Sequence, residues 1–211
     1  MKSIILTVEN YILKSYEKLL WGRKNNNPGI PMPLKNEHID NAHLVTDRIS
    51  QLKLLPKNGI VAEIGVYAGN YSEKILNITN PKKLFLIEIN KNHCNKLKKR
   101  FKHHINNGTI EIMNISSFEA HKYFDNKFFD FVYIDADHSY QGVKKDILNF
   151  SPKVKDDGFI ICNDYIYYDY IAFCYYGVMQ AVNEFCNLYG WKICYYTLSN
   201  NDFKDVILKK I

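Results

Sequence analysis

Residues 61–76 read VAEIGVYAGNYSEKIL, and this stretch decides the fold. It begins as an apolar strand, breaks at Gly65 and Gly69, and continues with the apolar spacing of a helix. Glycines at such a turn tolerate positive φ and let the backbone approach a ligand. Because ligands of open α/β sheets bind beyond the carboxyl ends of the strands, the stretch predicts a binding site at this turn.

The same alternation of strand and helix continues along the chain. Helical stretches separate the apolar strands predicted at 59–65, 83–90, 109–116, 128–137 and 157–164. Strands of this kind predict a parallel sheet with helices on both faces. Two further strands, at 191–199 and 203–211, follow each other without a helix and predict an antiparallel hairpin. The expected fold is therefore α/β and Rossmann-like, with a seven-stranded, mostly parallel sheet that ends in this hairpin.

An N-terminal arm precedes the first of these strands. Residues 1–19 have the spacing of an amphipathic helix, and Leu44, Val45, Ile49 and Leu52 fall on one helical face. We expect a helical arm or cap over 1–58 and an α/β domain over 59–211. The first helix caps the domain or contacts a partner or a membrane, and a homo-oligomer through this arm is one such arrangement.

Composition limits the class of protein. No apolar run reaches the ~18 residues of a membrane span, and the first twenty residues carry too much charge for a signal peptide. The five cysteines form no CxxC pair, which favours reduced thiols and a cytoplasmic protein. The net charge of +6 is concentrated at 90–104, either as a nucleic-acid patch or as a solvated helix face. That segment lacks interleaved aromatic residues, so we expect no nucleic-acid partner.

The glycine turn has the pattern E-x-G-x-x-x-G and lacks the dinucleotide fingerprint G-x-G-x-x-G. It resembles motif I of the class I S-adenosylmethionine-dependent methyltransferases. Adenosylmethionine carries an ammonium and a sulfonium, so an acid at the first strand end suits it. The second strand ends in an acid that can accept both ribose hydroxyls. The cofactor-binding residues expected from this resemblance are Glu63, Gly65, Tyr67, Gly69, Ser72, Glu88, Ser116, Ser117 and Asp135.

Acidic and amide side chains end two later strands. Asp135 lies near the carboxyl end of the strand at 128–137, and Asn163 and Asp164 end the strand at 157–164. Adjacent strand ends bring these oxygens together, and such a set suits Mg²⁺ or another divalent cation. The alternatives are a helix cap at Asp135 and a turn at the other two residues.

The stretch 131–144, FVYIDADHSYQGVK, narrows the resemblance. With the acid–amide pair at 163–164, it is similar to the metal-dependent small-molecule O-methyltransferases. One group of these comprises the catechol and caffeoyl-CoA enzymes. Another branch comprises macrocin O-methyltransferase, other sugar O-methyltransferases and cephalosporin-hydroxylase-like proteins. In the catechol type the acid of this pair precedes the amide, whereas here the amide Asn163 precedes the acid Asp164. His138 stands where that type has a lysine that acts as general base.

The resemblance implies O-methylation of a small hydroxylated molecule, such as a sugar or glycoside. The metal would bind two substrate oxygens, and His138 would take the hydroxyl proton. The aromatic segment 165–177 either roofs the substrate pocket or packs as core. Two alternatives stay open: a metal-independent methyltransferase of another acceptor, and a non-catalytic binding protein that retains the fold.

Overall fold

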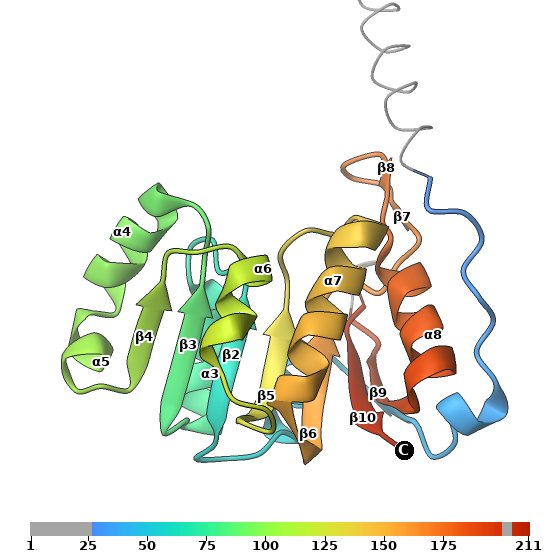
Figure 1. Cartoon of the computed structure of the whole chain (residues 1–211), viewed down its shortest axis with the longest axis horizontal. Helices are drawn as coiled ribbons and strands as arrows, with labels where there is room; N and C mark the ends of the chain where they lie inside the picture. The colour runs from blue at the N-terminus through green and yellow to red at the C-terminus, as the bar shows by residue number, and fades with distance from the viewer. Residues whose placement is uncertain (1–26, 200–203) are drawn as a thin grey trace, which may run out of the picture.

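The computed structural model describes residues 27–199 and 204–211, so the predicted helix within residues 1–19 lies outside the described residues. One sheet dominates, with strand order β1-β9-β10-β6-β5-β2-β3-β4 (Figure 1). Its strands are β1 (His43–Val45), β2 (Ile60–Ile64), β3 (Lys83–Ile87), β4 (Ile110–Met113), β5 (Phe129–Ile134), β6 (Val154–Cys162), β9 (Trp191–Thr197) and β10 (Val206–Lys210). A separate two-stranded hairpin is formed by β7 (Tyr168–Asp169) and β8 (Cys174–Tyr175).

Helices cover both faces of the large sheet, as the alternation predicted. The α-helices are α2 (Arg48–Lys53), α3 (Asn70–Thr79), α4 (Lys91–Arg100), α5 (Lys102–Asn106), α6 (Ser117–Ala120), α7 (Tyr140–Phe150) and α8 (Val178–Tyr189). Single 3₁₀ turns are η1 (Asn36–His38), η2 (His121–Tyr123) and η3 (Ser151–Lys153). Within the described residues, no helix has the length and hydropathy needed to span a bilayer.

Each face of the sheet has its own apolar core. Val143, Ile147 and Phe150 of α7 pack with α6 and α8 over one face. Leu52 of α2 and Leu97 of α4 pack with α3 over the other. The strands between the two layers are buried on both sides, and this accounts for their continuous apolar sequences.

The predicted α/β Rossmann-like class is confirmed, but the predicted count of seven strands is wrong. The sheet has eight strands because His43–Val45 pairs in parallel with β9, with Leu44 opposite Tyr196. The predicted helix through Leu44 and Val45 therefore begins only at Arg48, and the Leu44 side chain is 69% exposed. Pairing with a strand about 150 residues away overrides the local helical spacing.

The C-terminal hairpin of β9 and β10 extends the sheet and adds an antiparallel strand to it. β10 lies antiparallel to both β6 and β9, with Val206 opposite Cys162 and Tyr196. The start of β10 therefore lies at the edge where β5 and β6 end. β1 runs parallel to β9, so the residues that follow it reach the same edge. This topology places the segments after β1, β5 and β6 and before β10 around one point.

Candidate active site

A pocket of about 430 Å³ lies beyond the carboxyl ends of β2, β3, β4 and β5, within the range of small-molecule sites. Seven of the residues around it are Gly65, Tyr67, Glu88, His93, Ser116, Ser117 and Asp135. Six of the nine predicted cofactor-binding residues are thus together in one pocket: Gly65, Tyr67, Glu88, Ser116, Ser117 and Asp135. Glu63, Gly69 and Ser72 do not line it.

The two glycines of the turn have different roles. Gly65 has φ +82°, and a Cβ there would lie 2.1 Å from the main-chain oxygen of Asp135. Only glycine lets the end of β2 approach the end of β5 so closely. Gly69 begins α3 with φ +77°, and a Cβ there would meet Leu97 and Phe101 of the α4 region. Gly65 shapes the pocket, whereas Gly69 allows α3 to pack against α4.

Glu88 is the buried acid of the pocket. One carboxylate oxygen accepts hydrogen bonds from the backbone of Val66 (3.2 Å) and Tyr67 (2.8 Å), and the other accepts from Asn90 (2.8 Å). Although burial raises its pKa, these hydrogen bonds hold the pKa below its ordinary value. Glu88 is therefore ionised at neutral pH, as the predicted contact with ribose hydroxyls requires.

Glu63 turns away from the pocket. Its side chain is buried and accepts a hydrogen bond of 2.5 Å from the Ser72 hydroxyl of α3. Burial raises the pKa of Glu63 to about 8, and the Ser72 bond only partly offsets this. These two predicted cofactor residues thus contact each other and link β2 to α3.

The remaining predicted pocket residues lie on loops or at the start of α6. Tyr67 has φ +52° and a 70% exposed side chain, and its ring packs edge-on against His93. Ser116 caps α6 by accepting a hydrogen bond from the backbone of Glu119. Ser117 hydrogen-bonds to the buried carboxyl of Asp146, whose pKa burial raises to about 6.

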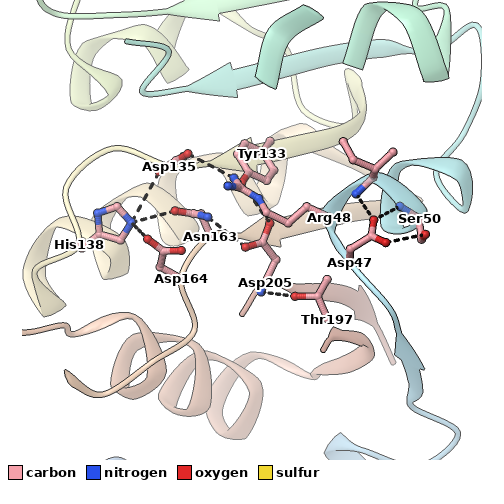
Figure 2. Close-up of polar contacts among 11 residues, drawn as sticks. Asp47, Arg48, Ser50, Tyr133, Asp135, His138, Asn163, Asp164, Thr197 and Asp205 are labelled. Atoms are coloured by element: carbon pink, nitrogen blue, oxygen red, sulfur yellow. Dashed lines mark hydrogen bonds and ion pairs between the residues drawn. The ribbon is translucent and has the colours of Figure 1, made fainter. Parts of the chain in front are cut away.

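The predicted metal ligands and the predicted base form a second cluster beside the pocket (Figure 2). The Nε2 atom of His138 lies 3.1 Å from Asn163 Oδ1, 3.6 Å from Asp135 Oδ1 and 3.5 Å from Asp164 Oδ2. Ser139, and not Asp135, caps α7, so the cap alternative for Asp135 is wrong. Asp164 has φ +52° in the loop after β6, and its main-chain oxygen accepts a hydrogen bond from Ile166.

The hydrogen bonds around His138 determine which ring nitrogen carries a proton. Asn163 Nδ2 donates to Asp205 Oδ1 at 3.0 Å, so its amide oxygen faces the imidazole. An amide oxygen can only accept, so Nε2 carries hydrogen. The other nitrogen, Nδ1, points away from these acceptors (Figure 2). No described residue forms a hydrogen bond with it.

Sequence analysis missed Arg48 and Asp205. Arg48, the first residue of α2, donates from Nε to Asp205 Oδ2 at 3.0 Å and hydrogen-bonds to the Tyr133 hydroxyl. Its Nη2 lies 3.6 Å from Asp135 Oδ2, and its guanidinium lies over the Tyr71 ring. Asp205 has no exposed surface. Both flank the carboxyl edge only through the pairings of β1 and β10, which no local motif signals.

Burial and crowding of the carboxylates raise their pKa values. Burial raises the pKa of Asp135 to about 8; Arg48 partly offsets this, whereas Asp164 and Asp205 add to it. Burial likewise raises the pKa of Asp164 to about 6, against the opposing effect of His138. The Asp205 pKa is also raised by burial, although Arg48 and Asn163 lower it. The cluster thus brings three acidic side chains and two basic side chains into contact.

A divalent cation does not fit this arrangement. On the predicted ligands Asp135, Asn163 and Asp164 it would lie roughly 2.0–2.6 Å from each oxygen. His138 Nε2 already lies among those oxygens, and the second oxygen of Asp135 faces Arg48. In residues 27–199 and 204–211, no group of three or more His, Cys, Asp or Glu side chains is arranged to hold a metal ion. The predicted Mg²⁺ is not supported.

Comparisons with known proteins show the family to which the domain belongs. A family model described as a methyltransferase domain matches residues 62–165, which is about half of the chain and includes every predicted site residue. These residues form a class I S-adenosylmethionine-dependent methyltransferase domain. No curated protein has a detectably similar sequence.

Solved methyltransferases share the fold of this domain. The B. subtilis tRNA methyltransferase is 10% identical, with a TM-score of 0.60 over 79% of this chain and 67% of its own. The ribosomal protein L11 methylase of Lactobacillus delbrueckii is 13% identical, with a TM-score of 0.55 over 77% and 74%. The M. jannaschii protein TYW2, solved with AdoMet, is 14% identical, with a TM-score of 0.52 over 85% and 79%. At these identities the likeness concerns the fold alone.

The geometry of the methyltransferase domain suits its cofactor. Gly65 opens the floor of the pocket, and the ionised Glu88 stands at the end of β3. Asp135 belongs to both the pocket and the cluster around His138. The pocket and the cluster around His138 therefore meet at the carboxyl edge of β5.

Proposed function

We propose that this chain methylates a hydroxyl group of a small molecule, such as a sugar or glycoside, with S-adenosylmethionine as donor. The observation that carries the proposal is the position of His138 beside Asp135, which lines the cofactor pocket. When bound, the cofactor supplies a methyl group from its sulfonium. Glu88 is the residue proposed to hold the ribose, and Ser116 and Ser117 are proposed to face the adenine.

His138 is the proposed proton acceptor, and its Nδ1 is the accepting atom. Asp135, Asn163 and Asp164 hold the Nε2–H group, as a carboxylate holds the imidazole of a catalytic triad. The two carboxylates then stabilise the imidazolium that forms when the acceptor hydroxyl loses its proton. Because the divalent cation does not fit, this route uses the chain's own groups alone.

Aromatic residues next to His138 support a small ring-shaped acceptor. The Tyr176 ring stacks on the imidazole at 4.6 Å, and its hydroxyl donates to Asp169. Gly177 donates its N–H to the His138 carbonyl at 2.7 Å, which ties the end of the β7–β8 hairpin to α7. Tyrosine rings offer both faces for stacking and hydroxyls for hydrogen bonding, which suits sugars.

The test is a methyl-transfer assay with labelled adenosylmethionine and three acceptor sets: glycosides and free sugars, catechols, and total RNA. We expect labelled product from a small hydroxylated acceptor, with and without EDTA. Labelled RNA alone would contradict the proposed acceptor class. Failure to bind adenosylmethionine would favour the non-catalytic alternative.

A variant of His138 tests whether this residue is the general base. His138→Ala should lower turnover by about 10²–10⁴-fold, the usual contribution of general-base catalysis. Affinity for adenosylmethionine should stay within about twofold, because His138 does not line the cofactor pocket. His103→Ala, on the exposed side of α5, is the matched control. Near-wild-type turnover in His138→Ala would assign the base to another group. The cytoplasmic location and the contact between copies through residues 1–58 stay predictions.

A further inference from the structure

The oxygens that a divalent cation would need are all occupied by protein N–H groups. His138 Nε2 faces Asn163 Oδ1 and one oxygen each of Asp135 and Asp164. Arg48 Nη2 faces the second oxygen of Asp135 at 3.6 Å. The Asn163 amide is fixed from behind by Asp205, so its oxygen cannot turn away.

Arg48 is held more firmly than an exposed ion pair would be. Its Nε atom contacts Asp205, whose side chain is fully buried, at 3.0 Å. The Tyr133 hydroxyl bonds to the same carboxylate at 3.1 Å, and the Tyr71 ring lies 4.6 Å from the guanidinium carbon. A guanidinium stays charged at all accessible pH values and stacks on aromatic rings. Arg48 therefore places a permanent positive charge beside Asp135.

We propose that Arg48 and His138 together occupy the position of a divalent cation, so that the site works without metal and removal of His138 converts it into a metal site. The proposal rests on the proposed function for its catalytic part. Its structural part concerns this chain's own residues and does not depend on the acceptor. Arg48 acts here as a positioning residue, since it orients Asp135 and does not reach the reacting atoms.

The positions of the two basic groups explain why the cluster does not also hold a divalent cation. Asp135, Asp164 and Asp205 are the acidic side chains of the cluster, and the imidazole and the guanidinium are the basic groups that lie within 4 Å of them. A dication at these oxygens would have to displace the imidazole N–H. It would also lie close to the permanent charge of the guanidinium, whose repulsion falls only slowly with distance where little water intervenes. Without the imidazole, three oxygens face an open position from fixed directions.

The test is Mn²⁺ titration followed by electron paramagnetic resonance, without cofactor or acceptor. Wild type, His138→Ala and His138→Ala/Asp164→Asn should fold alike, as judged by thermal melting. We expect His138→Ala to bind one Mn²⁺ roughly 10–1,000-fold more tightly than wild type, because the imidazole N–H that faces the three ligand oxygens is removed. The added Asp164→Asn change should reverse this gain. Wild-type affinity equal to or above that of His138→Ala would overturn the proposal.

Arg48 is tested by conservative replacement. Arg48→Lys keeps the charge and should retain at least about a tenth of wild-type kcat, whereas Arg48→Gln should lose about 10²-fold or more. The matched control is Lys144→Gln, because Lys144 also contacts a tyrosine hydroxyl and a carboxylate, Tyr140 and Glu184, but between α7 and α8. Equal kcat values for the two Arg48 variants, with both folded, would show that the charge has no role.

These experiments separate the two proposals. If no acceptor is methylated but Mn²⁺ binds His138→Ala and not wild type, the cation replacement stands and the proposed function fails. If methylation by wild type is abolished by EDTA and restored by Mn²⁺, the function stands and the cation replacement fails.

Discussion

Asp135 is the residue at which the two parts of the site meet. It lines the cofactor pocket, lies opposite the guanidinium of Arg48, and contacts the imidazole of His138. Its main-chain oxygen also packs against Gly65 of the glycine turn. The charge of a ligand in the pocket and the charges of the cluster around His138 would both act on this carboxyl group.

The raised pKa of Asp135 predicts pH-dependent cofactor binding. With a pKa of about 8, the free carboxyl is mostly protonated at pH 7, and a cationic ligand favours its ionised form. Affinity for adenosylmethionine should therefore increase from pH 6 to 8, by up to about tenfold per pH unit, and level off above pH 8. Calorimetry at pH 7 in two buffers should show proton release on binding, and Asp135→Asn should not release it. The same pH slope in Asp135→Asn would contradict the assignment.

The raised pKa of Glu63 predicts that the free energy of unfolding depends on pH. Its pKa is about 8 in the folded protein and 4.5 as the ordinary value, so the folded state holds the proton more tightly. Stability should fall as pH rises between these values, by at most about 1.4 kcal/mol per pH unit. Glu63→Gln lacks this loss, so its stability relative to wild type should rise across the same window in urea unfolding. Its affinity for adenosylmethionine should change less than about twofold, since Glu63 faces Ser72.

Among the elements, the short helix α2 has an unusually direct part in the site. It is six residues long and begins with Arg48, which follows the N-cap Asp47. The Asp47 side chain accepts hydrogen bonds from the backbone of Ile49 and Ser50, both at 2.8 Å. A helix of this length depends on its cap and its packing, because it makes few internal hydrogen bonds.

Loss of this cap should affect stability and turnover together. Asp47→Ala should reduce the free energy of unfolding by about 0.5–2 kcal/mol and lower kcat, because α2 positions Arg48. Asp47→Asn, which can still cap, should restore most of both. Chemical unfolding and single-turnover kinetics measure the two effects. An unchanged kcat in a destabilised Asp47→Ala would show that Arg48 is held by Asp205 without help from the helix.

Substitutions in the β7–β8 hairpin should change the KM for the acceptor and leave the affinity for the cofactor unchanged. Tyr170 and Ile171 at its tip are 69% and 76% exposed, and its base is tied to His138 through Tyr176. Tyr170→Ser and Ile171→Ser should raise KM for the acceptor about 3–30-fold, while Kd for adenosylmethionine stays unchanged. A raised Kd with unchanged acceptor KM would move the hairpin to the cofactor side.

The elements that sequence analysis predicted correctly are those whose pattern lies within a short stretch of the chain. The turn at Gly65, the acid Glu88 and the acids after β5 and β6 follow apolar strands, so their shared edge could be predicted. β1 could not, because its three residues fit the helical spacing of Leu52 and its partner is β9. Arg48 and Asp205 are 157 positions apart and meet only through this pairing and that of β10. The predicted metal is not supported, and sequence could not foresee this, because no local motif places the guanidinium of Arg48 beside Asp135.

At the scale of the whole molecule, the pocket depends on the complete sheet. Its walls come from the loops after β2, β3, β4 and β5, while the cluster beside it draws on β1, β6 and β10. Unfolding any part of the sheet separates these loops. A ligand of the pocket therefore binds the folded state and not the unfolded chain.

Cofactor binding should accordingly raise the melting temperature in proportion to the logarithm of its concentration. At a concentration 100 times Kd, binding adds about 2.7 kcal/mol to the free energy of unfolding. For a chain of this size each kcal/mol corresponds to about 2–4 °C, so the expected rise is roughly 5–10 °C. Glu88→Ala removes the proposed ribose acceptor and should shift the concentration dependence to higher adenosylmethionine by about 10-fold or more. Differential scanning fluorimetry measures both proteins in parallel, with ATP as a control for adenosine binding. If millimolar adenosylmethionine left the wild-type melting temperature unchanged, or if Glu88→Ala responded as wild type does, the pocket would not be the cofactor site.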